Sequence, residues 1–122
     1  MINDYFTILR SEATDHLSGV VSVRLNAHSI VYEGHFPGEP VSPGVCNIEM
    51  IRECAEAVHG HALRINRIKQ CRLTTLVTPL NHSTADVTIN LQEQEPNTYR
   101  LTATLGKGEE TYLTLKADVA DE

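Results

Sequence analysis

The sequence predicts an α+β fold in which an antiparallel β-sheet wraps around one long helix. Apolar and polar residues alternate over 19–26, 84–91, 99–105 and 111–119. This alternation is typical of strands with one buried face and one solvent-exposed face, as in antiparallel sheets. Residues 44–59 instead carry apolar residues at a three-and-four spacing, which predicts a helix. A sheet with one apolar face must bury that face, and this helix is the segment available to cover it.

The segments between these patterns predict how the elements are joined. Residues 93–97 and 106–109 are polar and contain Pro or Gly, so the last three predicted strands should form a meander. Gly60 follows the helical pattern and is expected to end the helix. Residues 63–77 hold several β-compatible side chains and precede Pro79, which predicts a long and bent strand.

Length and composition restrict the class of protein. The chain has 122 residues, which predicts a single domain over residues 1–122. Its net charge of −6 argues against nucleic acid as the main partner, because phosphate binding needs a concentrated positive field. The apolar runs are too short to cross a membrane, and residues 1–5 lack the features of a signal peptide. We therefore expect a cytoplasmic protein without a membrane partner.

Three cysteines, Cys46, Cys54 and Cys71, occur without a CxxC spacing. An odd number of cysteines with this spacing predicts neither a disulfide framework nor a zinc site. We expect all three to be small buried residues, because free cysteine is among the most buried residue types.

The candidate site begins in a loop that is rich in Gly and Pro. Residues 34–44 contain three of the seven glycines and three of the five prolines, together with His35. The loop leads into the predicted helix, where the N–H groups of Gly44 and Val45 have no intrahelical acceptor. Glu49 follows in the second turn. A histidine, a carboxylate and the N–H groups of a helix start are suited to moving a proton beside a carbonyl oxygen that gains negative charge.

The same residues carry a family resemblance. Residues 35–45 read His-Phe-Pro-Gly-Glu-Pro-Val-Ser-Pro-Gly-Val, which resembles the HFPGxPVxPGV signature of the 3-hydroxyacyl-[acyl carrier protein] dehydratases. Glu49 stands fourteen positions after His35, which matches the spacing between histidine and acid in that family. The resemblance implies the hot-dog fold, in which an antiparallel sheet wraps one helix.

The resemblance also implies a reaction and an assembly. His35 would remove the C2 proton of a 3-hydroxyacyl thioester, and Glu49 would protonate or hold the departing C3 hydroxyl. The N–H groups of Gly44 and Val45 would hold the thioester oxygen. The histidine and the acid come from opposite subunits in this family, so a homodimer is implied, with or without a larger assembly. The resemblance implies no metal and no organic cofactor.

Three positions depart from the family pattern. Ser42 stands where many members have Met, Arg52 where they carry Ala, and Glu53 where they often have Gln. We expect Arg52 and Glu53 to alter the acyl tunnel or the far wall of the site. Core fatty-acid synthesis and a specialised pathway for polyene pigments or unusual lipids both remain open.

Other polar residues allow two interpretations each. A solvated strand face and a docking surface for the acidic carrier protein are both compatible with the basic cluster. The cluster comprises Arg64, Arg67, Lys69 and Arg72. His59 and His61 could form half of a metal site, but we expect them to be solvated histidines at the helix end.

Two other functions compete with the dehydratase. A hot-dog acyl thioesterase would hydrolyse the same kind of thioester at a similar site. A non-catalytic subunit would bind an acyl carrier or pair with an active partner. The presence of both His35 and Glu49 favours the dehydratase, because a binding subunit needs neither.

Overall fold

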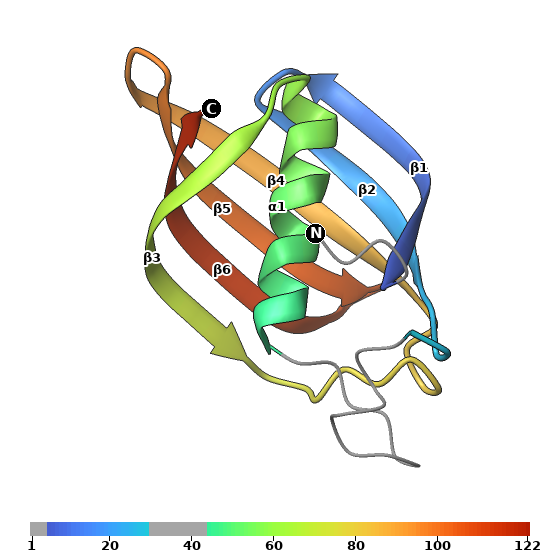
Figure 1. Ribbon diagram of the computed structural model, residues 1–122. Helices are drawn as coiled ribbons and strands as arrows, with labels where there is room; N and C mark the ends of the chain where they lie inside the picture. The colour runs from blue at the N-terminus through green and yellow to red at the C-terminus, as the bar shows by residue number, and fades with distance from the viewer. Residues whose placement is uncertain (1–4, 30–43) are drawn as a thin grey trace.

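Six antiparallel strands curve around one helix in the computed structural model (Figure 1), which describes residues 5–29 and 44–122. Most of the predicted loop, including His35 and Ser42, lies outside the described residues. In chain order the elements are β1 (Phe6–Asp15), β2 (Ser18–Leu25), α1 (Gly44–His59), β3 (Leu63–Leu73), β4 (Thr84–Glu95), β5 (Thr98–Lys107) and β6 (Glu110–Asp121).

The strands lie in the order β1-β2-β4-β5-β6-β3, and every neighbouring pair is antiparallel. The predicted meander is confirmed, because β4, β5 and β6 are consecutive both in the chain and in the sheet. The chain leaves β2 near one edge of the sheet and enters β3 at the opposite edge. The segment between these strands contains α1, which lies across the concave face of the sheet (Figure 1).

The core lies between α1 and the concave face of the sheet. In β2, β4, β5 and β6, the alternate apolar residues of the predicted pattern are buried, and they form the concave face. Val87, Leu101 and Leu115 are among the residues with no exposed surface. Within the described residues, no helix is long and apolar enough to cross a membrane.

Helix α1 spans residues 44–59 as the sequence predicts. Gly60 ends it with a positive φ of 85°, and its N–H donates to the carbonyl oxygen of Glu56 at 2.8 Å. The left-handed conformation at Gly60 suits glycine, which has no Cβ to clash. The three-and-four apolar spacing includes Ile51, Ala55 and Val58, which are buried, but also Val45, which is 76% exposed at the helix start.

Two strands differ from the sequence prediction. The sequence pattern does not reveal β1, because this edge strand exposes nearly every side chain and so shows no alternation. β3 ends at Leu73 rather than residue 77 and contains two register irregularities, one after Ile65 and one after Ile68. Such bulges bend a strand and increase its twist, which accounts for the predicted bend.

The expectation for the cysteines is right for two of the three. Cys46 and Cys54 are buried in the core, and burial raises the pKa of the Cys54 thiol to about 12. The expectation is wrong for Cys71, which is exposed on the edge strand β3. Cys71 is paired with Leu115, so its side chain lies on the concave side of the sheet. It lies at the edge of the sheet, where no described residue covers it.

The expectation of solvated helix-end histidines is wrong for His59. Its side chain is only 4% exposed, and Nδ1 lies 3.0 Å from the carbonyl oxygen of His16. Nε2 lies 2.8 Å from Oδ1 of Asp121, whose Oδ2 accepts the Tyr99 hydroxyl at 3.1 Å. Partial burial tends to raise the pKa of Asp121, but the hydrogen bonds from His59 and Tyr99 lower it overall. The network ties the end of α1 to β5 and β6, whereas His61 is exposed as expected.

Replacing the buried imidazole should destabilise the fold. We expect His59→Ala to lower the free energy of unfolding by about 2–3 kcal/mol, because it leaves a cavity and unpaired polar groups. The matched change His61→Ala, at an exposed neighbour, should cost less than about 0.5 kcal/mol. Urea unfolding of both variants measures the difference, and equal effects would contradict a structural role for His59.

Candidate functional site

Helix α1 presents two different sides. The side that faces the sheet carries buried residues, including Asn47, whose Oδ1 accepts the Tyr5 hydroxyl at 2.6 Å. The opposite side carries the polar residues Glu49, Arg52, Glu53 and Glu56, all partly exposed. Core packing of the first side therefore fixes the direction of the second. Glu49 lies on this outward side, with its side chain 34% exposed.

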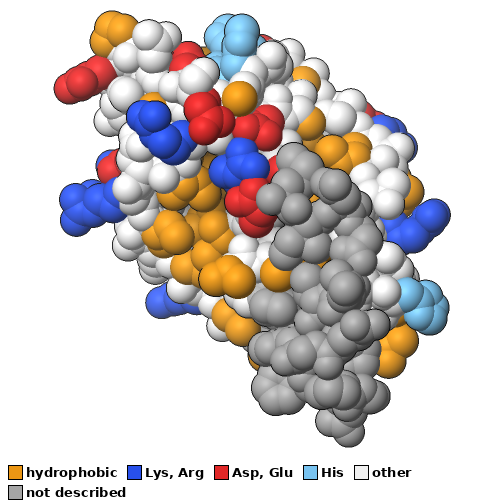
Figure 2. Space-filling model, in the orientation of Figure 1, with side chains coloured by type: hydrophobic (Ala, Val, Ile, Leu, Met, Phe, Trp, Pro, Cys, Tyr) orange, Lys and Arg blue, Asp and Glu red, His pale blue; other side chains and the backbone are white. Residues whose placement is uncertain are grey.

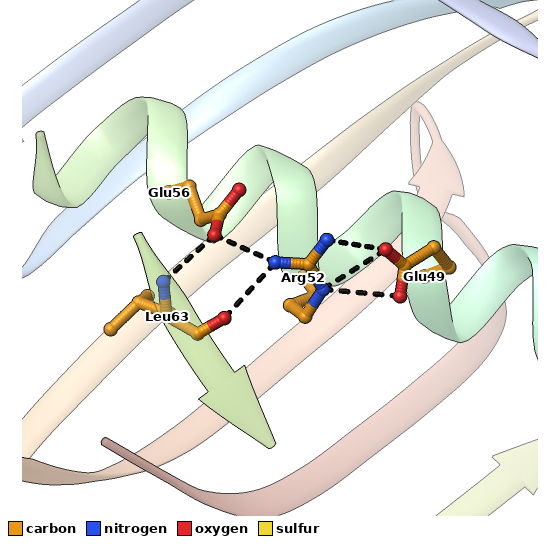
Figure 3. A network of polar contacts seen from close by, with 4 residues as sticks. All are labelled: Glu49, Arg52, Glu56 and Leu63. Carbon is orange, nitrogen blue, oxygen red and sulfur yellow. Dashed lines mark hydrogen bonds and ion pairs between the residues drawn. The ribbon is translucent and has the colours of Figure 1, made fainter. Parts of the chain in front are cut away.

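Arg52 connects Glu49 to the rest of the molecule (Figure 3). Its Nε lies 3.1 Å from each carboxylate oxygen of Glu49, and its Nη2 makes a second, shorter contact to Oε1. Nη1 donates to Glu56 Oε2 at 2.6 Å and to the carbonyl oxygen of Leu63 at 3.0 Å. Glu56 Oε2 also accepts the Leu63 N–H at 2.7 Å. The network therefore runs from the second turn of α1 to the first residue of β3.

This arrangement shifts the ionisation of neighbouring carboxyl groups in opposite directions. Hydrogen bonding to Arg52 lowers the pKa of Glu49 despite partial burial, and the same contacts raise the pKa of the Arg52 guanidinium. Burial, followed by the charge of Glu49, raises the pKa of Glu53. Glu49 is thus held as a carboxylate near neutral pH, while Glu53 is the carboxyl group that takes up a proton more readily.

Arg52 and Glu53 line different surface hollows. Glu49 and Arg52 line one hollow together with Leu63, Arg64, Ile65 and Glu122. Glu53 lines another, at the far half of α1, together with Ile8, Glu56, Ala57 and His61. Arg52 and Glu53 therefore lie in separate hollows, and Arg52 is the one that contacts Glu49.

The start of α1 is exposed, as the predicted oxygen-binding role requires. Gly44 is the first helical residue, and the first turn contains no acidic side chain to compensate the positive end of the helix dipole. A Cβ at Gly44 would meet no atom within 4 Å. The described packing therefore does not require glycine at this position.

The basic cluster lies on the exposed edge strand β3. Arg64, Arg67 and Arg72 are paired with residues on the convex face of β6, so they share the face turned away from α1. Lys69 occupies one of the register irregularities. Hydrogen bonding to Arg100, with smaller effects from Lys69 and Arg67, lowers the pKa of Asp118 on β6. The four residues form a solvent-exposed strip, and the structure keeps them apart from Glu49, except that Arg64 lines its hollow.

The described residues hold one half of the predicted catalytic pair. His35 lies outside them, so its position relative to Glu49 stays a prediction. The Arg52 network was not foreseen, although its signal is readable, because Glu49, Arg52 and Glu56 follow the i,i+3 and i,i+4 spacing of helical ion pairs. Within residues 5–29 and 44–122, no three His, Cys, Asp or Glu side chains are grouped closely enough to hold a metal ion.

Glycine at the helix start should be dispensable for folding. We expect Gly44→Ala to leave the free energy of unfolding within about 1 kcal/mol of wild type, because alanine is the better helix former. Gly19→Ala provides the contrast, since a Cβ there would lie 2.8 Å from both Ala13 Cα and the Glu12 carbonyl oxygen. Gly19→Ala should therefore lower the free energy of unfolding by roughly 1–3 kcal/mol. Thermal and urea unfolding measure both variants. A larger loss of unfolding free energy in Gly44→Ala than in Gly19→Ala would contradict the prediction.

Comparison with known proteins identifies relatives of this chain. The profile of the ApeI-like family, described as ApeI dehydratase, matches residues 11–113. A 3-hydroxyacyl-[acyl-carrier-protein] dehydratase FabZ from Levilactobacillus brevis is 27% identical over 118 residues, covering 88% of this chain and 80% of the relative. The FabZ of Lactiplantibacillus plantarum is 30% identical over 90 residues, covering 65% of this chain and 61% of the relative.

Solved structures place the fold. The dehydratase heterocomplex ApeI:P from Xenorhabdus doucetiae aligns with a TM-score of 0.73 at 17% identity, over 93% of this chain and 96% of that one. A thioesterase from Pseudomonas aeruginosa aligns with a TM-score of 0.60 at 11% identity, over 91% and 78% of the two chains. These similarities confirm the hot-dog fold. The profile match covers most of the chain, and the chain therefore belongs to the ApeI-like dehydratase family.

Proposed function

We propose that this chain dehydrates a 3-hydroxyacyl thioester, carried by acyl carrier protein, to a trans-2-enoyl thioester and water in the cytoplasm. The observation that carries the proposal is the place of Glu49. Its carboxylate lies on the outward side of α1, its side chain is 34% exposed, and it stands at the signature spacing from His35. Membership in a dehydratase family supports the same reaction class.

The proposed reaction uses four positions of the chain. His35 takes the C2 proton, the C3–O bond breaks, and the electron pair of the C2–H bond becomes the second bond between C2 and C3. The departing hydroxyl leaves as water: either Glu49 protonates it, or Glu49 holds it while His35 passes on the proton taken from C2. The N–H groups of Gly44 and Val45 bind the thioester oxygen as it gains negative charge. No metal or organic cofactor takes part in this scheme.

The substrate carrier is proposed from charge and from the relatives. The basic strip of Arg64, Arg67, Lys69 and Arg72 offers an acidic carrier protein a positive surface in a chain whose net charge is −6. The names of the FabZ relatives include acyl carrier protein, which supports this choice over coenzyme A. The pathway is fatty-acid synthesis or a specialised route to polyenes or lipids.

One assay separates the dehydratase from its competitors. A short trans-2-enoyl thioester, on carrier protein or coenzyme A, is incubated with the purified protein while enoyl absorbance and free thiol are followed together. We expect enoyl loss without thiol release, and a decrease of at least about 100-fold in both His35→Ala and Glu49→Gln. Thiol release would instead favour the thioesterase. No change in either signal would favour the non-catalytic subunit, and full activity in His35→Ala would contradict the assigned base.

We further propose that the active form is a homodimer joined at β3. This edge strand lacks a neighbour on its outer side within the described chain, and its apolar residues Ile68 and Leu73 are 45% and 50% exposed. Apolar side chains gather between α1 and β3 in the space-filling view (Figure 2). An exposed apolar edge strand favours pairing with another chain.

If the two chains pair at β3, a charge introduced on β3 should prevent dimer formation, whereas the same charge on β1 should not. Sedimentation should detect a dimer for the wild type and a monomer for Ile68→Glu, because the carboxylate would be buried in the interface. Ile8→Glu is the matched control, since Ile8 is 40% exposed on the opposite edge strand β1. A monomeric wild type, or dissociation caused equally by both changes, would rule out a β3 interface.

A further inference from the structure

We infer that Arg52 is a positioning residue, which holds Glu49 as a fixed carboxylate so that Glu49 binds the departing hydroxyl and does not protonate it. This inference rests on the proposed function and assigns the role of Glu49 within it. It also assigns a role to Arg52, which the four-position scheme above does not use.

The first step of the argument is geometric. Arg52 is held at three points, by Glu49, by Glu56 and by the carbonyl oxygen of Leu63, and its side chain is only 17% exposed. A planar guanidinium fixed in this way presents its N–H groups in one direction. Both oxygens of Glu49 accept from it, so the plane of the carboxylate is fixed as well. The exposed third of the Glu49 side chain remains available to a ligand.

The second step concerns charge. On α1, one guanidinium lies among three carboxyl groups, those of Glu49, Glu53 and Glu56. From the elements packed beside it, Arg64 on β3 and the C-terminal residue Glu122 line the same hollow. Arg52 is the positive group in direct contact with Glu49, and its hydrogen bonds lower the pKa of that carboxyl. Without Arg52, the partial burial of Glu49 would instead raise the pKa of its carboxyl.

The third step is the proton balance of the elimination. An ionised Glu49 has no proton to give to the departing hydroxyl. The proton that His35 takes from C2 is then the proton that leaves with the hydroxyl as water, and His35 returns to its neutral form. Glu49 accepts a hydrogen bond from the C3 hydroxyl and holds it in place to receive that proton. Arg52 therefore acts through Glu49 and does not touch the substrate.

The experiment compares Arg52→Gln with Arg64→Gln in the full-length protein. Arg64 is the matched control, because it lines the same hollow but donates to Asn66 and not to Glu49. A carbon-13 NMR titration follows the Glu49 carboxyl, assigned by its loss in Glu49→Gln. We expect the wild-type carboxyl to titrate below its ordinary value of 4.5. Arg52→Gln should raise this pKa by about one unit or more, and Arg64→Gln by less than about 0.3 unit.

The kinetic measurement shows whether Glu49 acts as an ionised hydrogen-bond acceptor or as a proton donor. Between about pH 7 and 9, Arg52→Gln should lower kcat for dehydration roughly 10-fold with little change in KM, because a charge-assisted contact that fixes Glu49 is lost. Adding Arg52→Gln to Glu49→Gln should change the rate by less than about 2-fold, since Arg52 acts through Glu49. If Glu49 were the proton donor, Arg52→Gln would increase the rate in this pH range.

The outcomes separate the two proposals. A wild-type Glu49 that titrates at or above its ordinary value, or a faster Arg52→Gln enzyme, overturns the role of Arg52 and leaves the dehydratase intact. An inactive wild type overturns the dehydratase, while the NMR titration still decides whether Arg52 keeps Glu49 charged. Should Arg52→Gln fail to fold, Arg52→Lys retains the charge but loses the paired contact. It should then show a smaller pKa rise and a smaller loss of kcat, and no change in either would contradict the inference.

Discussion

Burial of one side of α1 against the concave sheet is the interaction on which the rest of the structure depends. Met50, Ile51 and Cys54 have no exposed surface, so the helix cannot rotate without opening the core. This constraint fixes the outward direction of Glu49, the proposed catalytic acid, and of Arg52, which contacts it. The fold therefore supplies the site with a rigid helix, and preorganisation of this kind is where positioned catalytic groups gain much of their effect.

The outward side of α1 also concentrates charge. Glu49, Glu53 and Glu56 surround Arg52, and the shared guanidinium favours the ionised form of the carboxylate nearest the helix start. In the inferred role of Arg52, a single arginine on the helix thus keeps the neighbouring acid ionised.

Much of the fold could be predicted from the sequence, because it is encoded in local periodicity. The limits of α1 and the meander of β4, β5 and β6 follow from apolar spacing and turn residues. β1 could not be predicted, because an exposed edge strand carries no alternating pattern. The burial of His59 depends on its contacts with His16 and Asp121, which are far away in the sequence. Local spacing cannot reveal such contacts.

The candidate site was predictable only in part. Glu49 could be found from its place after a helix start and from the family signature, whereas its pairing with Arg52 required attention to helical ion-pair spacing. The position of His35 depends on the loop and, in the proposed assembly, on a second chain. Sequence can name such a residue as a candidate, but in the proposed homodimer its distance from Glu49 depends on how the two chains pair.

Subunit complementation tests this composite site most directly. His35→Ala and Glu49→Gln, each inactive alone, are unfolded together, refolded as an equal mixture and assayed for enoyl thioester hydration. If the two residues meet across a homodimer, half of the dimers carry one intact site, and about a quarter of wild-type activity should return. If activity stays at the level of the separate variants although mixed dimers form, the site is not shared between two chains.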